Sequence, residues 1–586
     1  MRVLAESPWG IFTVGATIPI ALLMGNYLRF IRVGKVLEAS TLGVILLLLA
    51  VWGGKLVYQN AHWAHVFGLR DIQLAWLIIG YGVISSSLPV WLLLAPRDYL
   101  CTFMKLGTIL VLAAGILLTL PHLQMPALTQ FIDGSGPVVP GRIFPFCFIT
   151  IACGAISGFH SLVASGTTPK IIGRESYVRS IGYGAMCLES FVAIMALIAA
   201  CTLEPSVYFS MNLKGDPAAT VAKINTLGYP VTTDQMSTLA GQLGESTLFG
   251  RTGGAATLAV GMAKIFAQVV HGRWLDLWYH FAIMFEALLI LTTLDAGTRV
   301  GRYLLQSLFG QLWPPLGEVK NPLLALLASA LIVAAWGCFL IQGVHDPLGG
   351  INSLWPLFGI ANQLLAAIVL CLATTVILKM QLKPAATAGP RRHPAYILVT
   401  LLPLIWLLTV TVTAELEKIF HPDPRIGFLA QAHVLKAKID AATAPQTVSA
   451  SAPTAATLAD LAKNRALYFN NLLDAGVAEI FLVLVLAIVI ISVREWLLLW
   501  TRSKPNVLHE TPPVWLPGYA VTEGRPLHLA GAAALALTLA RELSGETQLD
   551  RARVHACTCA ATTPATDAKL YLQVTEHRYT NIRRCC

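Results

Sequence analysis

Charged residues are scarce in this chain of 586 residues, because only 12% of them are Asp, Glu, Lys or Arg. Soluble proteins carry about twice that share, and their surfaces need it to stay in solution. Hydrophobic residues make up 56% of the sequence, which excludes disorder, since disorder requires low hydrophobicity and high charge. The short alternating segments of outer-membrane barrels are absent. The composition therefore predicts an all-α protein that crosses a lipid bilayer many times.

Several catalytic motifs are missing as well. The sequence has no G-x-x-x-x-G-K-[ST] loop to hold ATP phosphates and no H-E-x-x-H pair to hold zinc. None of its cysteines form a C-x-x-C pair, and four lie near the C-terminus, at Cys557, Cys559, Cys585 and Cys586. We therefore expect neither an ATP-driven pump nor an enzyme, and no cofactor or metal.

The net charge of +10 indicates membrane topology rather than a nucleic-acid partner. A short apolar run at 255–270 carries Lys264, and basic residues alternate between connections only if this run does not cross the membrane. We predict about eleven transmembrane helices, with the N-terminus outside and the C-terminus in the cytoplasm. Runs long enough to span lie near 11–28, 37–54, 72–95, 103–120, 143–165, 183–203, 277–297, 321–343, 354–379, 394–414 and 475–493.

The connections divide the chain further. The transmembrane domain covers about 1–500, and two long connections, 204–254 and 415–473, are then extracytoplasmic. Residues 501–586 are expected to form a cytoplasmic tail, because their one Ala/Leu-rich stretch is too short to span.

The first polar cluster lies at the end of the fifth apolar run, 143–165. Gly154 and Gly158 are four residues apart, a spacing that lets another helix approach closely. The stretch 165–169 (SGTTP) predicts a broken helix, because Pro removes a donor and disfavours helix before it. Broken helices expose backbone groups that bind ions or solutes. His160 is then either a proton carrier in such a site or a structural side chain bonded to a neighbour.

The second cluster lies in the run 277–297 and at its exit. Glu286 is near the centre of the run, where an unpaired carboxyl group favours its protonated form, as proton coupling requires. Glu189 is a second carboxylate of this kind. The alternative for both acids is a structural hydrogen bond. Asp295 and Arg299 are four residues apart and are expected to pair, and the sequence 295–298 (DAGT) predicts a helix interruption.

The third cluster surrounds the run 354–379. Pro356 and Gly359 predict loosened first turns, whose carbonyls could coordinate a cation or a solute beside the amides of Asn362 and Gln363. The alternative is a tryptophan anchor at the membrane interface followed by a kinked packing helix.

A weaker signal, Arg97-Asp98, ends the third run. These two residues are expected at the cytoplasmic mouth, as a gate or as a topology anchor.

These segments together resemble the carbon starvation protein A (CstA) family. The resemblance covers about 1–500 and rests on four motifs in one order, PRDYL from Pro96, GFHSLVASGTTPK from Gly158, DAGTR from Asp295 and DPLGGINSLWPLFGIANQ from Asp346. It implies a bacterial inner-membrane transporter for small peptides, or for pyruvate with protons, used during carbon starvation. It also implies the inverted repeat of the APC (LeuT-like) carriers, with discontinuous helices.

The resemblance also implies roles for particular residues. The central substrate site would be lined by His160, Ser161, Thr167, Thr168, Asp295, Asn352, Asn362 and Gln363. We infer proton coupling at Glu286, His160 or Glu189, and a gate or structural pair among Arg97, Asp98, Asp295 and Arg299.

The sequence departs from the family at both ends. Family members have further helices before Ser7, so we expect N-terminal helices of the family to be missing. Residues 543–546 and 583–586 resemble a YbdD-like small protein, which predicts a fused or degraded partner. Two rival functions stay open, a nutrient sensor that signals through its cytoplasmic tail and a passive channel.

Overall fold

The computed structural model describes residues 7–31, 35–88, 93–151, 154, 156–166, 168, 172, 176–213, 215–317, 321–345, 355–382, 393–443 and 455–506. Within this part of the chain all regular secondary structure is helical.

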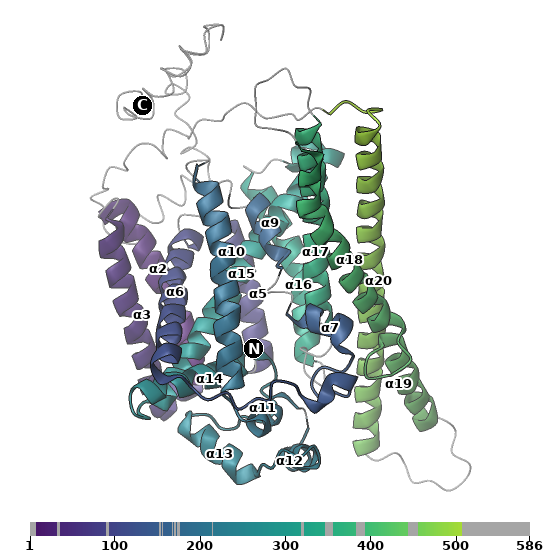
Figure 1. Ribbon diagram of the computed structural model, residues 1–586. Helices are drawn as coiled ribbons and strands as arrows, with labels where there is room; N and C mark the ends of the chain where they lie inside the picture. Colours follow the sequence, from purple (N-terminus) through teal and green to yellow (C-terminus); the bar gives the residue numbers. More distant parts are fainter. Residues whose placement is uncertain are drawn as a thin grey trace.

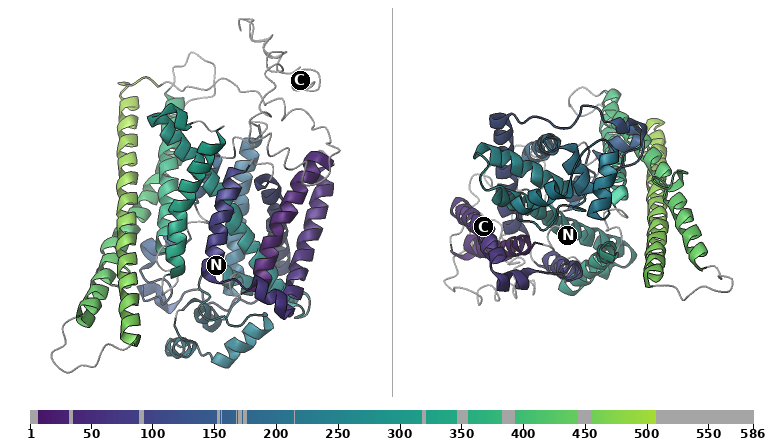
Figure 2. Two further views of the ribbon diagram at one scale, coloured as in Figure 1. Left: turned by 180° about the vertical axis from the view of Figure 1, so that it is seen from behind. Right: turned by 90° about the horizontal axis from the view of Figure 1, so that it is seen from below.

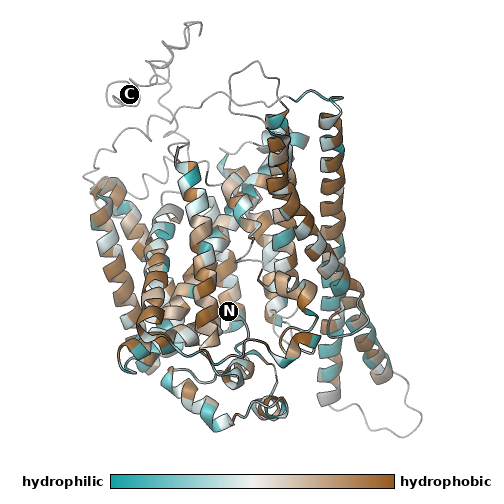
Figure 3. Ribbon diagram, viewed as in Figure 1, coloured by the Kyte–Doolittle hydropathy of each residue, from teal (hydrophilic) through white to brown (hydrophobic). Residues whose placement is uncertain are grey.

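Nine of the described helices are long and apolar enough to cross a membrane. They stand side by side as a bundle in Figures 1 and 2, and Figure 3 shows apolar residues along most of their length. The prediction of an all-α multi-pass membrane protein is confirmed. The nine helices are α2 (Pro8–Asn26), α3 (Val36–Gln59), α6 (Leu94–Thr119), α10 (Ser176–Cys201), α15 (Leu275–Leu312), α16 (Pro322–His345), α17 (Trp355–Gln381), α18 (Leu398–Phe420) and α20 (Ala455–Trp500).

The two other predicted spans, 72–95 and 143–165, correspond to helices that are short or divided. The short helix α4 (Ala61–Phe67) meets α5 (Asp71–Ser87) at 61°, and the run 143–165 is divided into α7 (Ile143–Thr150) and α9 (Phe159–Gly166). The predicted number of eleven is reached only if each divided segment counts as one span.

The predicted boundary between the third and fourth spans is wrong. Helix α5 already ends at Ser87, and α6 begins at Leu94, so the span expected at 72–95 is shorter and the one expected at 103–120 is longer. As a consequence Arg97 and Asp98 lie near the start of α6 instead of at the end of the preceding span.

The connection 204–254 is a folded cap. Its helices α11 (Pro205–Asn212), α12 (Pro217–Thr226) and α13 (Thr233–Gln242) lie together below the bundle in Figure 1. Asn212 fastens this cap to α14 (Gly254–Val269), because its amide donates to Thr257 Oγ1 at 3.1 Å and accepts from the Gly253 N–H at 3.0 Å. Helix α14 has 16 residues, fewer than the roughly 20 needed to cross a bilayer.

The connection expected at 415–473 is mostly helical. Helix α18 continues to Phe420, α19 covers Phe428–Thr443, and α20 begins at Ala455. The predicted tail lies outside the described residues from 507 onward, with its four cysteines and its YbdD-like segments.

Helix α17 packs directly against the backbone where α7 and α9 are separated. A Cβ atom on Gly158 would overlap the carbonyl oxygen of Asn362 and the backbone nitrogen of Ala366, so this contact requires glycine.

We therefore expect Gly158→Ala to destabilise the folded protein by about 1–3 kcal/mol, because the added methyl group must push α17 away. The apparent melting temperature of the purified protein, followed by tryptophan fluorescence, should fall by several degrees. Gly182→Ala on α10, where a Cβ would meet nothing within 4 Å, is the matched control. Equal melting temperatures for the two variants would contradict the close packing.

Candidate functional site

Helix α15 carries the polar residues of the second sequence cluster. It runs without a break over 38 residues, so the interruption predicted at 295–298 is wrong. Gly297 instead makes room for α9, because a Cβ at this position would lie 3.2 Å from the ring of Phe159.

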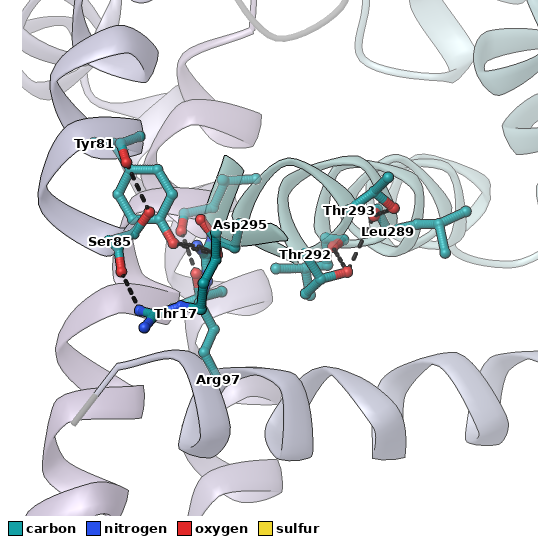
Figure 4. A network of polar contacts seen from close by, with 12 residues as sticks. Thr17, Tyr81, Ser85, Arg97, Leu289, Thr292, Thr293 and Asp295 are labelled. Carbon is teal, nitrogen blue, oxygen red and sulfur yellow. Dashed lines mark hydrogen bonds and ion pairs between the residues drawn. The ribbon is translucent and has the colours of Figure 1, made fainter. Parts of the chain in front are cut away.

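Asp295 forms a buried ion pair with Arg97, and Figure 4 shows both side chains together with Tyr81. Arg97 Nη1 lies 3.1 Å from Asp295 Oδ2, and both side chains are only 1% exposed. The Tyr81 hydroxyl, from α5, donates to the same carboxylate oxygen at 2.5 Å and accepts a short hydrogen bond from Arg97. Three helices, α5, α6 and α15, are thus joined at one carboxylate.

The expected Asp295–Arg299 pair is wrong. Arg299 donates to the backbone carbonyls of Ser85 and Leu88 at 2.7 and 2.8 Å, and Arg302 donates to the carbonyl of Ser86 at 2.7 Å. The last carbonyls of a helix have no partner within it. Two arginines of α15 therefore satisfy the end of α5, where this span stops.

The expected place of Arg97 and Asp98 at the cytoplasmic mouth stays a prediction. Arg97 is enclosed by protein, so its side chain contacts other helices and is not exposed as a surface anchor would be. Asp98 is half-buried, and its Oδ1 has no hydrogen-bond partner among the described residues. One further cation belongs to this region, since Lys105 donates to Thr292 Oγ1 at 2.6 Å.

The second broken span is held by α17. The Gln363 amide donates to the carbonyl of Phe148 in α7 at 2.9 Å, and Asn362 Oδ1 accepts from the Phe159 N–H, at the start of α9, at 2.9 Å. Two neighbouring amides therefore bond to the backbone on both sides of the division. The expected loosening of α17 is not observed, because the helix is regular from Trp355. Gly359 instead allows close approach, as a Cβ there would lie 2.5 Å from the Ile149 carbonyl oxygen.

The predicted residues on α9 are partly accessible. His160 Nδ1 lies 3.0 Å from Glu189 Oε2 on α10, with exposed fractions of 57% and 31%. Ser161 donates a short hydrogen bond to the Gly158 carbonyl, and Thr168 is half-buried. Two other predicted site residues, Thr167 and Asn352, lie outside the described residues.

Glu286 lies on the other side of α15 from Asp295. Nine residues separate the two, which at 100° per residue places them about 180° apart. Glu286 is half-buried, and no described residue lies within hydrogen-bonding distance of its carboxyl group. It is therefore not part of the Asp295 cluster.

Glu415 is a buried acid that the sequence analysis did not identify. It is 0% exposed, and neither carboxyl oxygen has a hydrogen-bond partner among the described residues. One helical turn earlier, Thr411 donates to Gln363 at 2.9 Å. The expected span ended at residue 414, because Glu415, Glu417 and Lys418 interrupt the apolar run, whereas α18 continues as a helix to Phe420.

Phe159 connects the two polar regions. Its backbone N–H is bonded to α17, and its ring packs against Gly297 of α15. The structure therefore places the Asp295 cluster and the Asn362–Gln363 pair on the two helices that flank α9. Among the described residues there is no group of His, Cys, Asp and Glu able to hold a metal ion.

The fold and these clusters define a class, the polytopic helical membrane proteins with discontinuous spans and buried charges. The family model of carbon starvation protein CstA matches residues 1–414. The chain belongs to this family.

Curated relatives agree with the family match. The chain is 47% identical to the peptide transporter CstA of Escherichia coli K12, over 87% of this chain and 71% of that protein. It is 43% identical to the pyruvate/proton symporter BtsT of the same organism, over 88% of this chain and 73% of that protein. It is 51% identical to the peptide transporter CstA of Campylobacter jejuni, over 72% of this chain and 59% of that protein. No solved structure matches the chain.

We expect Asp295→Leu to destabilise the protein by about 3–5 kcal/mol, because it leaves the Arg97 guanidinium buried without its partner. The double variant Arg97→Met/Asp295→Leu should recover most of this loss, since neither charge is then buried alone. The measurement is a double-mutant cycle of thermal unfolding in detergent. Additive losses in the double variant would show that the two side chains do not interact.

Proposed function

We propose that the chain is a secondary transporter that moves small peptides or pyruvate into the cell together with protons. The names of the relatives support this proposal, since they describe peptide transport and pyruvate/proton symport. The proposal includes the bacterial inner membrane as the location, a cytoplasmic C-terminus, the proton as coupling ion without a cofactor, and transport in place of catalysis.

One observation carries the proposal, the buried Arg97–Asp295 pair beside the end of α5. Ionisable groups at membrane depth are costly, and they commonly mark the path of a solute or an ion. Here the charged cluster lies where a span stops, and irregular backbone at membrane depth is tolerated where it is buried in protein or lines a cavity.

We assign the substrate site to the region around α9, with His160, Ser161 and Thr168 on one side and Asp295, Asn362 and Gln363 on the flanking helices. The remaining predicted members are Thr167 and Asn352. A YbdD-like small protein is a further proposed partner.

Uptake by the full-length protein in proteoliposomes tests the proposed activity. With an acidic exterior, labelled pyruvate or a labelled dipeptide should accumulate above its external concentration, because proton entry drives the solute uphill. Addition of an uncoupler should abolish accumulation. Equilibration without accumulation would indicate a passive channel, and the absence of any flux would reject the transporter.

We also propose Glu286 as the proton-coupling carboxylate, with the His160–Glu189 pair as its alternative. Glu286→Gln should abolish accumulation driven by a pH gradient and should preserve exchange of labelled for unlabelled solute, since the amide cannot bind and release a proton. Asp440→Asn, an exposed acid on α19, is the control. Full pH-driven accumulation by Glu286→Gln would exclude this role.

A further inference from the structure

One face of α15 carries a row of buried polar side chains. Asp295, Arg299, Arg302 and Gln306 follow one another at intervals of four, three and four residues, which places them on one side of a helix. Each is at most 6% exposed.

The charges in this row do not balance. Asp295 is already paired with Arg97, and no described carboxylate lies within ion-pair distance of Arg299 or Arg302. Both arginines donate to neutral carbonyls at the end of α5, and the Arg302 guanidinium also lies over the Tyr303 ring, 4.6 Å from its centroid. The negative end of the α5 dipole offsets only part of two full charges. An anion stabilises a buried guanidinium more than a neutral carbonyl does, because both partners of the hydrogen bond are then charged.

The row also contains donors that are not used. The Nε–H groups of Arg299 and Arg302 and both ends of the Gln306 amide have no hydrogen-bond partner among the described residues. These groups are enclosed by protein and lie along about two turns of one helix face. Capping of α5 does not account for the whole row, because the Gln306 amide makes no hydrogen bond to the described end of α5.

We propose that the face of α15 from Arg299 to Gln306 binds the carboxylate of the transported solute. A guanidinium presents paired N–H donors that match the two oxygens of a carboxylate, and an amide N–H can add a third hydrogen bond. The proposal rests on the proposed function for the identity of the solute. Pyruvate and a peptide both carry a carboxylate, so one site serves both.

The position of this face fits a site reached from the cytoplasm. Helix α15 begins beside α14 and the cap formed by α11, α12 and α13, and a rise of 1.5 Å per residue places Arg302 about 40 Å further along. The distribution of basic residues predicts that the end of the bundle that carries Arg302, opposite the cap, is cytoplasmic. The arginines would therefore hold the carboxylate on the side where the solute is released.

Ligand-dependent thermal stabilisation of the full-length protein in nanodiscs tests the site without requiring transport. The probes are pyruvate, glycylglycine and their neutral amides, pyruvamide and glycylglycinamide. The wild type should be stabilised by the two carboxylates and not by the amides. Arg302→Gln should raise the half-saturating carboxylate concentration at least tenfold and remove the preference over the amide.

Gln306→Leu provides a second variant that changes no charge, in case Arg302→Gln fails to fold. It should raise the same concentration about threefold to tenfold. Arg465→Gln, an exposed arginine on α20, should change nothing. Stabilisation by pyruvate alone or by glycylglycine alone would show which solute the site accepts, and either result supports it.

The inference is overturned if no carboxylate stabilises the wild type, or if Gln306→Leu and every folded Arg302 variant keep the wild-type affinity and preference. Parallel uptake assays separate this result from the proposed function. Uptake by the wild type with unchanged carboxylate affinity in the variants rejects the site alone. Carboxylate binding that the variants lose, without uptake by the wild type, rejects the transporter alone.

Discussion

A helix end that is enclosed by protein leaves backbone groups without hydrogen-bond partners from water, and this constraint organises the structure. Other parts of the protein must therefore supply the partners. The partners are side chains from unbroken neighbours. Arg299 and Arg302 of α15 bond to the end of α5, and Asn362 and Gln363 of α17 bond to α7 and α9.

The two arrangements differ in charge, and this difference suggests a division of roles. The amides of α17 are neutral and hold the backbone in place at little electrostatic cost. The arginines of α15 bring charge into the protein interior, and Asp295, the described carboxylate beside them, is already in an ion pair with Arg97. Buried charges often contribute no more to stability than neutral side chains of similar size. The retained charge therefore favours a role in binding an anionic solute.

The sequence predicted the membrane class, most of the spans and the residue types at membrane depth, because long apolar runs and rare polar residues are visible without a structure. It did not predict which side chains pair with one another. Asp295 and Arg299 share a helix face by spacing, but Asp295 pairs with Arg97 of another helix. Such a tertiary contact leaves no local pattern in the sequence. The end of α5 was misplaced because apolar residues continue past Ser87. Glu415 was missed because three charged residues ended the apolar run before the helix did.

An electron cryo-microscopy map of the full chain with bound pyruvate or glycylglycine would test the central claim most directly. The account predicts density for the solute between the end of α5 and α15, with its carboxylate within hydrogen-bonding distance of Arg302 or Gln306. Solute density remote from both broken spans would contradict it, as would a map in which the Arg299–Gln306 face of α15 contacts lipid.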